Sequence, residues 1–159
     1  GYLPNGGCIQ KKYDYGCVPP KEGEPYTPEK HFKVRIYRVT YTNIDGKVFE
    51  FTPRQVQQWC AQVGLIPVEE CYCGMAKDLY PDLSPSEHWN ENFIDRLAGD
   101  PNFYMELDSP HCNNKVPHEG LVIKIDDGVT RAFKLKCFRF LNKEQELLDK
   151  GETNIEDEA

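Results

Sequence analysis

Two Asp-Gly pairs, Asp45-Gly46 and Asp127-Gly128, each stand between two strand-like segments. The flanking segments are residues 32–42 and 47–51 for the first pair, and residues 120–125 and 131–139 for the second. Asp-Gly tolerates the positive φ angles that a tight hairpin turn requires. The sequence therefore predicts two antiparallel β-hairpins, one in each half of the chain.

The first hairpin is followed by a predicted helix with well-defined ends. Thr52 stands directly before Pro53, so a capping hydroxyl precedes a residue suited to the first helical position. Apolar residues then recur at helical spacing until Gly64, a residue typical of helix C-termini. These signals predict one amphipathic helix between the two caps.

Two further helices are predicted later in the chain. The second begins at residues 84–87, where Ser84 and Glu87 have the spacing of a capping box, and it ends at Gly99. Asn142 is predicted to cap the third helix, which runs to Gly151. Hairpins and separate helices indicate an α+β fold, with antiparallel sheets and flanking helices, rather than a series of β-α-β units.

The composition argues against a membrane protein. No segment of the 159 residues approaches the roughly 18 consecutive apolar residues of a membrane-spanning helix, and no basic-then-apolar signal segment is present. We therefore expect no membrane partner and a cytoplasmic location. The chain starts with Gly1 and a turn-like stretch rather than with methionine, which suggests a fragment or a trimmed form of a longer protein.

Seven cysteines, an odd number without a secretory signal, indicate a reducing compartment, so we expect free thiols. Cys71 and Cys73, together with His111 and Cys112, could be considered as a zinc site. One residue separates the first two cysteines, whereas paired zinc ligands are typically separated by about two to four residues. We therefore predict no disulfide and no metal site.

The formal net charge of −7 differs from the basic footprint expected of a nucleic-acid-binding protein. Part of the acidic charge is local, because residues 152–159 are rich in carboxylates. Basic residues gather at 11–12, 33–38 and 124–139. The sequence thus predicts one domain part over residues 1–151, followed by an acidic tail or linker.

The strongest chemical signal lies in the second hairpin, at Glu119, Lys134 and Lys136. Side chains alternate along a strand, so the two lysines should point to the same face, about 7 Å apart. Two like charges on an inward face are unfavourable unless an anion such as phosphate lies between them. Hairpin pairing would bring the Glu119 carboxylate to the same patch. Alternatively, the lysines lie on the solvent face of an edge strand, where they discourage aggregation.

Residues 119–124 (Glu-Gly-Leu-Val-Ile-Lys) and 134–136 (Lys-Leu-Lys) resemble the fourth and fifth signature motifs of the covalent nucleotidyltransferases, which include ATP-dependent ligases and capping enzymes. Residues 6–17, 36–40 and 140–152 are similar to the phage-type RNA ligases, in the same order. The resemblance covers nearly the whole chain. It implies the C-terminal part of the adenylyltransferase domain of an ATP-dependent RNA ligase from a bacterial or phage-infected cell.

The resemblance also implies a reaction and roles for four residues. Such ligases join RNA 5′-phosphate and 3′-hydroxyl ends through enzyme-AMP and RNA-adenylate intermediates, with ATP and Mg²⁺ as cofactors, and we expect a monomer. Glu119 would help to hold the nucleotide, through its ribose or the metal environment. Lys134 and Lys136 would neutralise the phosphates of ATP and of the adenylate. Tyr37 would stack on adenine, although a core tyrosine is the alternative.

One element of the family pattern is missing from these 159 residues. The family's nucleophile is a lysine in Lys-x-Asp-Gly, but Asn43 and Ile125 stand two places before the aspartates of the two Asp-Gly pairs. The nucleophile is therefore expected upstream of Gly1. Because covalent catalysis needs that amine, the chain alone is expected to be inactive.

Three other classes of protein stay open on the sequence. A non-catalytic nucleotide- or RNA-binding module would keep the fold without the chemistry. A DNA ligase or capping enzyme would share the final motifs, although the segment at residues 11–17 resembles RNA ligases more closely. A structural or interaction domain without a nucleotide site would suit the acidic composition.

Overall fold

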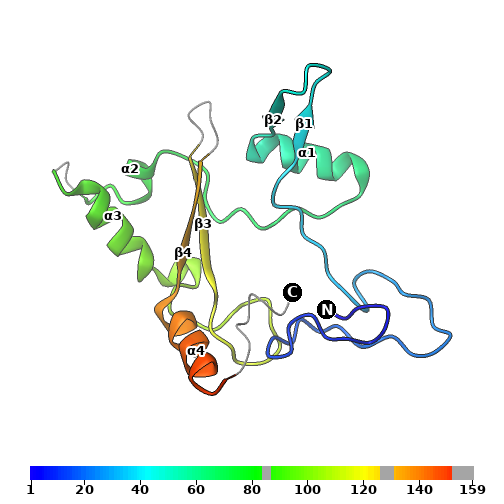
Figure 1. Cartoon of the computed structure of the whole chain (residues 1–159). Coiled ribbons are helices and arrows are strands. Elements are labelled where there is room, and N and C mark those ends of the chain that lie inside the picture. The colour runs from blue at the N-terminus through cyan, green and yellow to red at the C-terminus, as the bar shows by residue number, and fades with distance from the viewer. Residues whose placement is uncertain (84–86, 126–130, 152–159) are drawn as a thin grey trace. The chain divides into compact units, whose positions relative to one another are not determined.

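The computed structural model describes residues 1–83, 87–125 and 131–151. Strands and helices are mixed along the chain, and the described part contains two two-stranded sheets (Figure 1). The elements are β1 (Thr40–Thr42), β2 (Val48–Glu50), α1 (Pro53–Val63), α2 (Ala76–Leu79), α3 (Trp89–Ala98), the short 3₁₀ helix η1 (Pro101–Phe103), β3 (Gly120–Ile125), β4 (Arg131–Lys136) and α4 (Phe138–Asp149). The expected α+β class is confirmed.

The chain divides into two compact units. Unit 1 combines Gly1–Lys33, Tyr72–Val122 and the described residues from Lys134 onward. Unit 2 combines Val34–Cys71 with the described residues between Ile123 and Phe133. Unit 1 therefore contains α2, α3, η1 and α4, and unit 2 contains the β1–β2 hairpin and α1.

The first hairpin forms in unit 2 as its turn predicts. β1 and β2 are antiparallel, and Tyr41 pairs with Phe49. At the turn, the Asn43 side-chain oxygen accepts hydrogen bonds from the backbone N–H groups of Asp45 and Lys47, and Gly46 takes a positive φ of 77°. The side chain of Asn43 thus stabilises the turn that Asp-Gly predicts.

The first predicted strand is too long. Residues 32–42 were expected to form one strand, but β1 covers Thr40–Thr42 alone. Ile36 instead forms an isolated parallel bridge with Pro67, donating to Ile66 and accepting from Val68. Its backbone hydrogen bonds therefore go to the segment after α1 rather than to β2.

Helix α1 begins and ends at the predicted residues. The Thr52 hydroxyl accepts from the Gln55 backbone N–H at 3.3 Å, and the Gln55 side chain accepts from the Thr52 N–H at 2.9 Å. Gly64 closes the helix in the left-handed conformation, at a φ of 72°. The helix buries Val56 and Cys60 on one face, as its apolar spacing predicts.

Helix α3 is confirmed at its C-terminus but begins later than expected. It starts at Trp89, after His88, which makes no side-chain capping bond, and Gly99 follows its last residue. The capping box was predicted on Ser84 and Glu87. Residues 84–86 lie outside the described part of the chain, and the described helix starts two residues beyond Glu87.

The predicted start of the last helix is wrong. Asn142 lies inside α4, which begins at Phe138, and β4 correspondingly ends at Lys136 rather than at Arg139. The Glu106 carboxylate accepts the backbone N–H groups of Phe138 and Arg139, so it satisfies the helix N-terminus from a distant loop. A side chain from outside the helix thus performs the capping that the sequence analysis assigned to Asn142.

β3 and β4 pair at the point where the candidate motifs lie. Gly120 begins β3 beside the end of β4, so the strands run antiparallel. A side chain at Gly120 would collide with the backbone oxygen of Leu135, and its φ of 139° is a conformation that favours glycine. The Cys137 N–H donates to the Glu119 carbonyl at 3.0 Å. The predicted turn of this hairpin, at Asp127-Gly128, lies outside the described residues.

Candidate functional site

Glu119 and Lys134, which both belong to unit 1, form an ion pair. Glu119 directly precedes β3, and Lys134 lies in β4. The close approach of Gly120 to β4 places both backbones at the right separation. The side chains are 42% and 44% exposed, so water screens the attraction and leaves both groups accessible to a ligand.

Lys136 contacts two residues of α4. Its Nζ lies 3.1 Å from the Glu144 Oε2 and 5.3 Å from the centre of the Phe140 ring. Phe140 and Glu144 are four residues apart, so they lie on one face of the helix. Both are buried, whereas Lys136 is partly exposed. The last residue of β4 is thereby fixed against the helix that follows it.

These contacts change the electrostatic argument made from the sequence. Two lysines on one face were expected to require an external anion, and phosphate was the natural choice. In the structure Glu119 and Glu144 each provide a carboxylate to one of the lysines. The chain therefore supplies the compensating charge itself, and a bound phosphate would share these lysines with carboxylates.

Aromatic side chains of the N-terminal loop lie in the same unit and contact a lysine of α4. The rings of Tyr13 and Tyr15 stack with centres 6.1 Å apart, and the Lys143 Nζ lies 5.4 Å from the centre of the Tyr13 ring. Burial, together with the nearby Cys112 and Glu119, raises the pKa of Tyr15 to about 12. Both tyrosines therefore stay neutral hydroxyl groups at physiological pH, because the pKa of Tyr13 is also raised by burial.

The loop that resembles RNA ligases is attached to a second loop of unit 1. The Asp14 N–H donates to the Asn114 side chain at 2.9 Å, and the Asn113 N–H donates to the Asp14 carbonyl at 2.7 Å. The Asn114 side chain also donates to the Lys12 carbonyl. Residues about 100 positions apart in the sequence thus fix the loop beside the segment that leads to Glu119.

Tyr37 belongs to unit 2, whereas Glu119, Lys134 and Lys136 belong to unit 1. Its side chain is 66% exposed, which differs from the alternative of a core tyrosine. Its backbone carbonyl accepts a hydrogen bond of 2.7 Å from the Lys124 Nζ. An exposed ring on a fixed backbone is suited to stacking, and the stacking of Tyr37 on adenine stays a prediction.

The cysteines are free thiols, and those considered for zinc show no ligand geometry. Burial raises the pKa of Cys71, with a contribution from Glu69, and burial also raises the pKa of Cys112. A raised pKa favours the neutral thiol, whereas metals bind the thiolate. Within residues 1–83, 87–125 and 131–151, no three His, Cys, Asp or Glu side chains cluster as a metal site would require.

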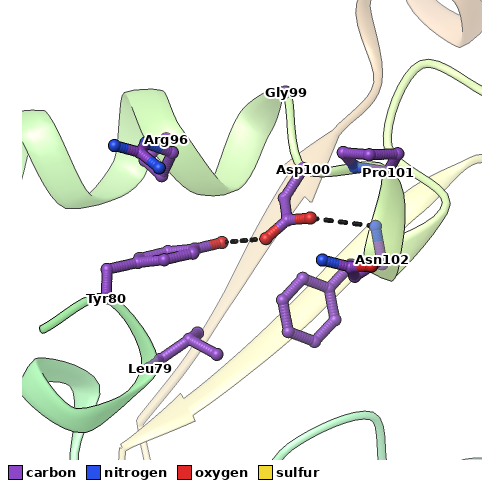
Figure 2. A pocket seen from close by; sticks show the side chains of 8 residues that line it. Leu79, Tyr80, Arg96, Gly99, Asp100, Pro101 and Asn102 are labelled. Carbon is purple, nitrogen blue, oxygen red and sulfur yellow. Dashed lines mark hydrogen bonds between the residues drawn. The ribbon is translucent and has the colours of Figure 1, made fainter. Parts of the chain in front are cut away.

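A pocket of about 430 Å³ lies between α3 and η1, but its polar groups serve the fold (Figure 2). The buried Asp100 accepts the Tyr80 hydroxyl at 2.6 Å and caps η1 through the Asn102 N–H at 2.9 Å. Arg96 lies over the Tyr80 ring, with 5.7 Å from its guanidinium carbon to the ring centre, and pairs with Asp82. Because these groups already satisfy one another, the pocket shows no reactive group.

Comparison with other proteins does not assign the chain to a family. No protein-family model, curated protein or solved structure matches it. Among the described helices, none has both the length and the apolar character needed to cross a bilayer. Function must therefore be argued from the residues of the site.

Sequence reasoning missed Glu144 and Phe140, which both contact Lys136. Their four-residue spacing was visible, but the third helix was expected to begin at Asn142 and would not have included Phe140. The contact also requires α4 to begin immediately after Cys137, so that Phe140 and Glu144 lie close to the end of β4. A helix predicted to start at Phe138 would have placed both residues on one face, next to the end of β4.

Proposed function

We propose that this chain is part of an ATP-dependent RNA ligase and contributes the phosphate-binding lysines of its adenylate-transfer site. The observation that carries the proposal is the meeting of Glu119 with Lys134, with Lys136 two residues further along the same strand. These are the residues that resemble the fourth and fifth motifs of the nucleotidyltransferases. A carboxylate and two lysines on paired strands are the groups that a nucleotide phosphate and its metal ion require.

In the proposed site the lysines act as cations. Adenylate transfer depends mainly on positioning and on neutralising the charge of the phosphates. Lys134 is accessible, so its side chain could move to stay in contact with the phosphates. Lys136 is held against α4 and would provide a positive charge at a fixed position. An ammonium held by carboxylates is a poor nucleophile, so neither lysine takes the place of the missing Lys-x-Asp-Gly lysine.

The residues present fit Mg²⁺ through one carboxylate. Mg²⁺ is commonly bound by one or two carboxylates together with substrate phosphates and water. Glu119 is 42% exposed at its side chain, so it could provide an oxygen to such an ion. The ion would neutralise phosphate charge alongside the lysines. Glu119 itself would orient Lys134. Because this ion pair is exposed, little free energy is lost when Lys134 leaves Glu119 and binds a phosphate instead.

A non-catalytic nucleotide- or RNA-binding module is the second candidate. It is favoured by the internal pairing of both lysines. Such a module would bind ATP or RNA phosphates at the same strands but would form no covalent intermediate. The two candidates therefore differ in whether a longer form of the protein accepts AMP.

Incubation with Mg²⁺ and ATP labelled on the α-phosphate tests the proposal. The 159-residue chain should carry no label that survives denaturation, whereas the protein expressed with its upstream coding sequence should become labelled at a Lys-x-Asp-Gly lysine. Stable label on the 159-residue chain would mean that the nucleophile has been misplaced. An upstream sequence without the motif, and without labelling, would favour the binding module.

A further inference from the structure

Lys134 and Lys136 have the same chemistry but different surroundings. The Lys134–Glu119 pair is exposed to solvent on both sides, so each partner can exchange the other for water or a ligand. The Lys136–Glu144 pair includes a carboxylate residue that is only 6% exposed. The second pair is therefore far harder to open than the first.

Helix α4 determines where the Lys136 ammonium lies. Phe140 is 1% exposed, and its ring and the Glu144 carboxylate approach the ammonium from the same helix face. The N-terminus of that helix is itself fixed by Glu106, which accepts the backbone N–H groups of Phe138 and Arg139. A lysine side chain has four flexible bonds, so these contacts remove much of the freedom that the ammonium would otherwise have.

The burial of Glu144 makes this contact important to both partners. A buried carboxylate is unfavourable unless a charge or hydrogen bond compensates it. Its Oε2 lies 3.1 Å from the Lys136 Nζ, and its Oε1 has no hydrogen-bond partner within the described part of the chain. The ion pair with Lys136 therefore compensates the buried charge of Glu144. Among the ion pairs of the described residues, Glu144 forms one with Lys136 and with no other cation.

We propose that Glu144 is a positioning residue, which holds the Lys136 ammonium where a nucleotide phosphate binds. This inference rests on the proposed function, since it assumes that Lys136 binds phosphate. An ammonium has three N–H donors, so a bond to Glu144 is compatible with a second bond to a phosphate oxygen. Because the ammonium is held before the ligand arrives, binding loses less side-chain entropy than it would with a mobile lysine.

The affinity of the 159-residue chain for Mg·ATP, measured by titration calorimetry, tests this role. Glu144→Gln should weaken binding about tenfold, the order expected for one hydrogen bond to a charged group. Glu146→Gln is the matched control, because Glu146 is exposed on the same helix and its substitution changes the net charge equally. It should leave the affinity unchanged. Circular dichroism of each variant checks that α4 remains folded.

A double-mutant cycle separates positioning from a purely structural role. Lys136→Ala should weaken binding at least as much as Glu144→Gln, and adding Glu144→Gln to Lys136→Ala should cause no further loss. Additive losses would show that Glu144 acts independently of Lys136 and would overturn the inference. Tighter binding by Glu144→Gln would show that the carboxylate competes with phosphate, and would overturn it as well.

Glu144→Asp keeps the test decisive if the glutamine variant unfolds. Aspartate preserves the charge but is one methylene shorter, so the ammonium should be drawn away and the affinity should fall to an intermediate value. An affinity equal to that of the unchanged chain would overturn the positioning role.

If the unchanged chain does not bind Mg·ATP, the proposed function fails. If it binds and only Lys136→Ala weakens binding, the function stands and Glu144 has no positioning role.

Discussion

Unit 1 and unit 2 both combine strands with helices, but they bury very different sets of apolar side chains. In the described part of unit 1, large apolar residues from the N-terminal loop through α4 are buried. They are Tyr13, Tyr80, Leu97, Phe103, Met105, Val116, Phe140 and Leu147. In the described part of unit 2, Val56 and Cys60 of α1 are the buried apolar residues, while Tyr41, Ile44 and Phe49 of the hairpin are exposed.

This difference indicates which residues of the candidate site lie in the more stable unit. Burial of apolar surface is the main favourable contribution to folding, so unit 1 should resist unfolding more than unit 2. Glu119, Lys134 and Lys136 belong to unit 1. Tyr37 belongs to unit 2, whose stability depends more on hydrogen bonds in its turn and helix caps than on buried apolar side chains. We therefore expect the backbone around the proposed phosphate site to open less often than the backbone around Tyr37, the residue proposed to stack on adenine.

The largest expected effect is the loss of a core ring from unit 1. Phe140→Ala should lower the free energy of unfolding of unit 1 by about 3–5 kcal/mol, because it removes a fully buried aromatic side chain. Phe49→Ala in unit 2 should change stability by less than about 0.5 kcal/mol, since Phe49 is exposed. Hydrogen exchange in α4 and β2 measures the two effects. Similar losses from both substitutions would contradict the contrast between the units.

A smaller effect is expected from the core of unit 2. Val56→Ala should lower the stability of that unit by about 2 kcal/mol, because two buried methyl groups are lost. Amide exchange should then accelerate in α1 and in the β1–β2 hairpin but remain slow in α4. Equal acceleration in α4 would indicate that the chain unfolds as one cooperative unit.

The capping of α1 should contribute about 1 kcal/mol. Thr52→Ala removes the hydroxyl that accepts from the Gln55 N–H, and such substitutions typically cost about that amount. Thr52→Ser keeps the hydroxyl and is the matched control. Urea titration followed by circular dichroism compares the variants. If the alanine and serine variants behave alike, the capping box does not stabilise this helix.

The smallest effect is expected from the exposed ion pair. Glu119→Gln should change the stability of unit 1 by about 0–1 kcal/mol, because solvent screens its attraction to Lys134. Any change should diminish further in high salt. Thermal melts at low and high salt provide the measurement. A large, salt-independent loss would mean that Glu119 has a structural role that its exposure does not indicate.

Features set by neighbouring residues were predictable from the sequence. Thr52, Pro53 and Gly64 fix α1 through bonds within the helix and its caps, and the helix forms where they predict. Asn142 failed as a cap because Glu106, more than 30 residues earlier, satisfies the N-terminus of α4 instead. The long first strand failed for a similar reason, since Ile36 bonds to residues beyond α1.

The candidate site follows the same division. A hairpin places Glu119 beside Lys134, so this contact could be anticipated from the pairing of two strands. The contact of Lys136 with Glu144 depends on where α4 begins after β4, and the sequence analysis placed that start at Asn142 instead of Phe138. The sequence therefore predicted the charged groups and the neighbouring strands, while the carboxylate that holds Lys136 required the tertiary structure.

The adenylylation of a Lys136 variant tests the central claim most directly. In the protein expressed with its upstream coding sequence, Lys136→Ala should lower the rate of AMP transfer by about 10²–10³-fold, as expected for loss of one preorganised electrostatic contact. Lys77→Ala, an exposed lysine of α2, should change the rate little. Equal effects from the two substitutions would mean that the lysines of β4 are ordinary surface charge, and would contradict the proposed nucleotide site.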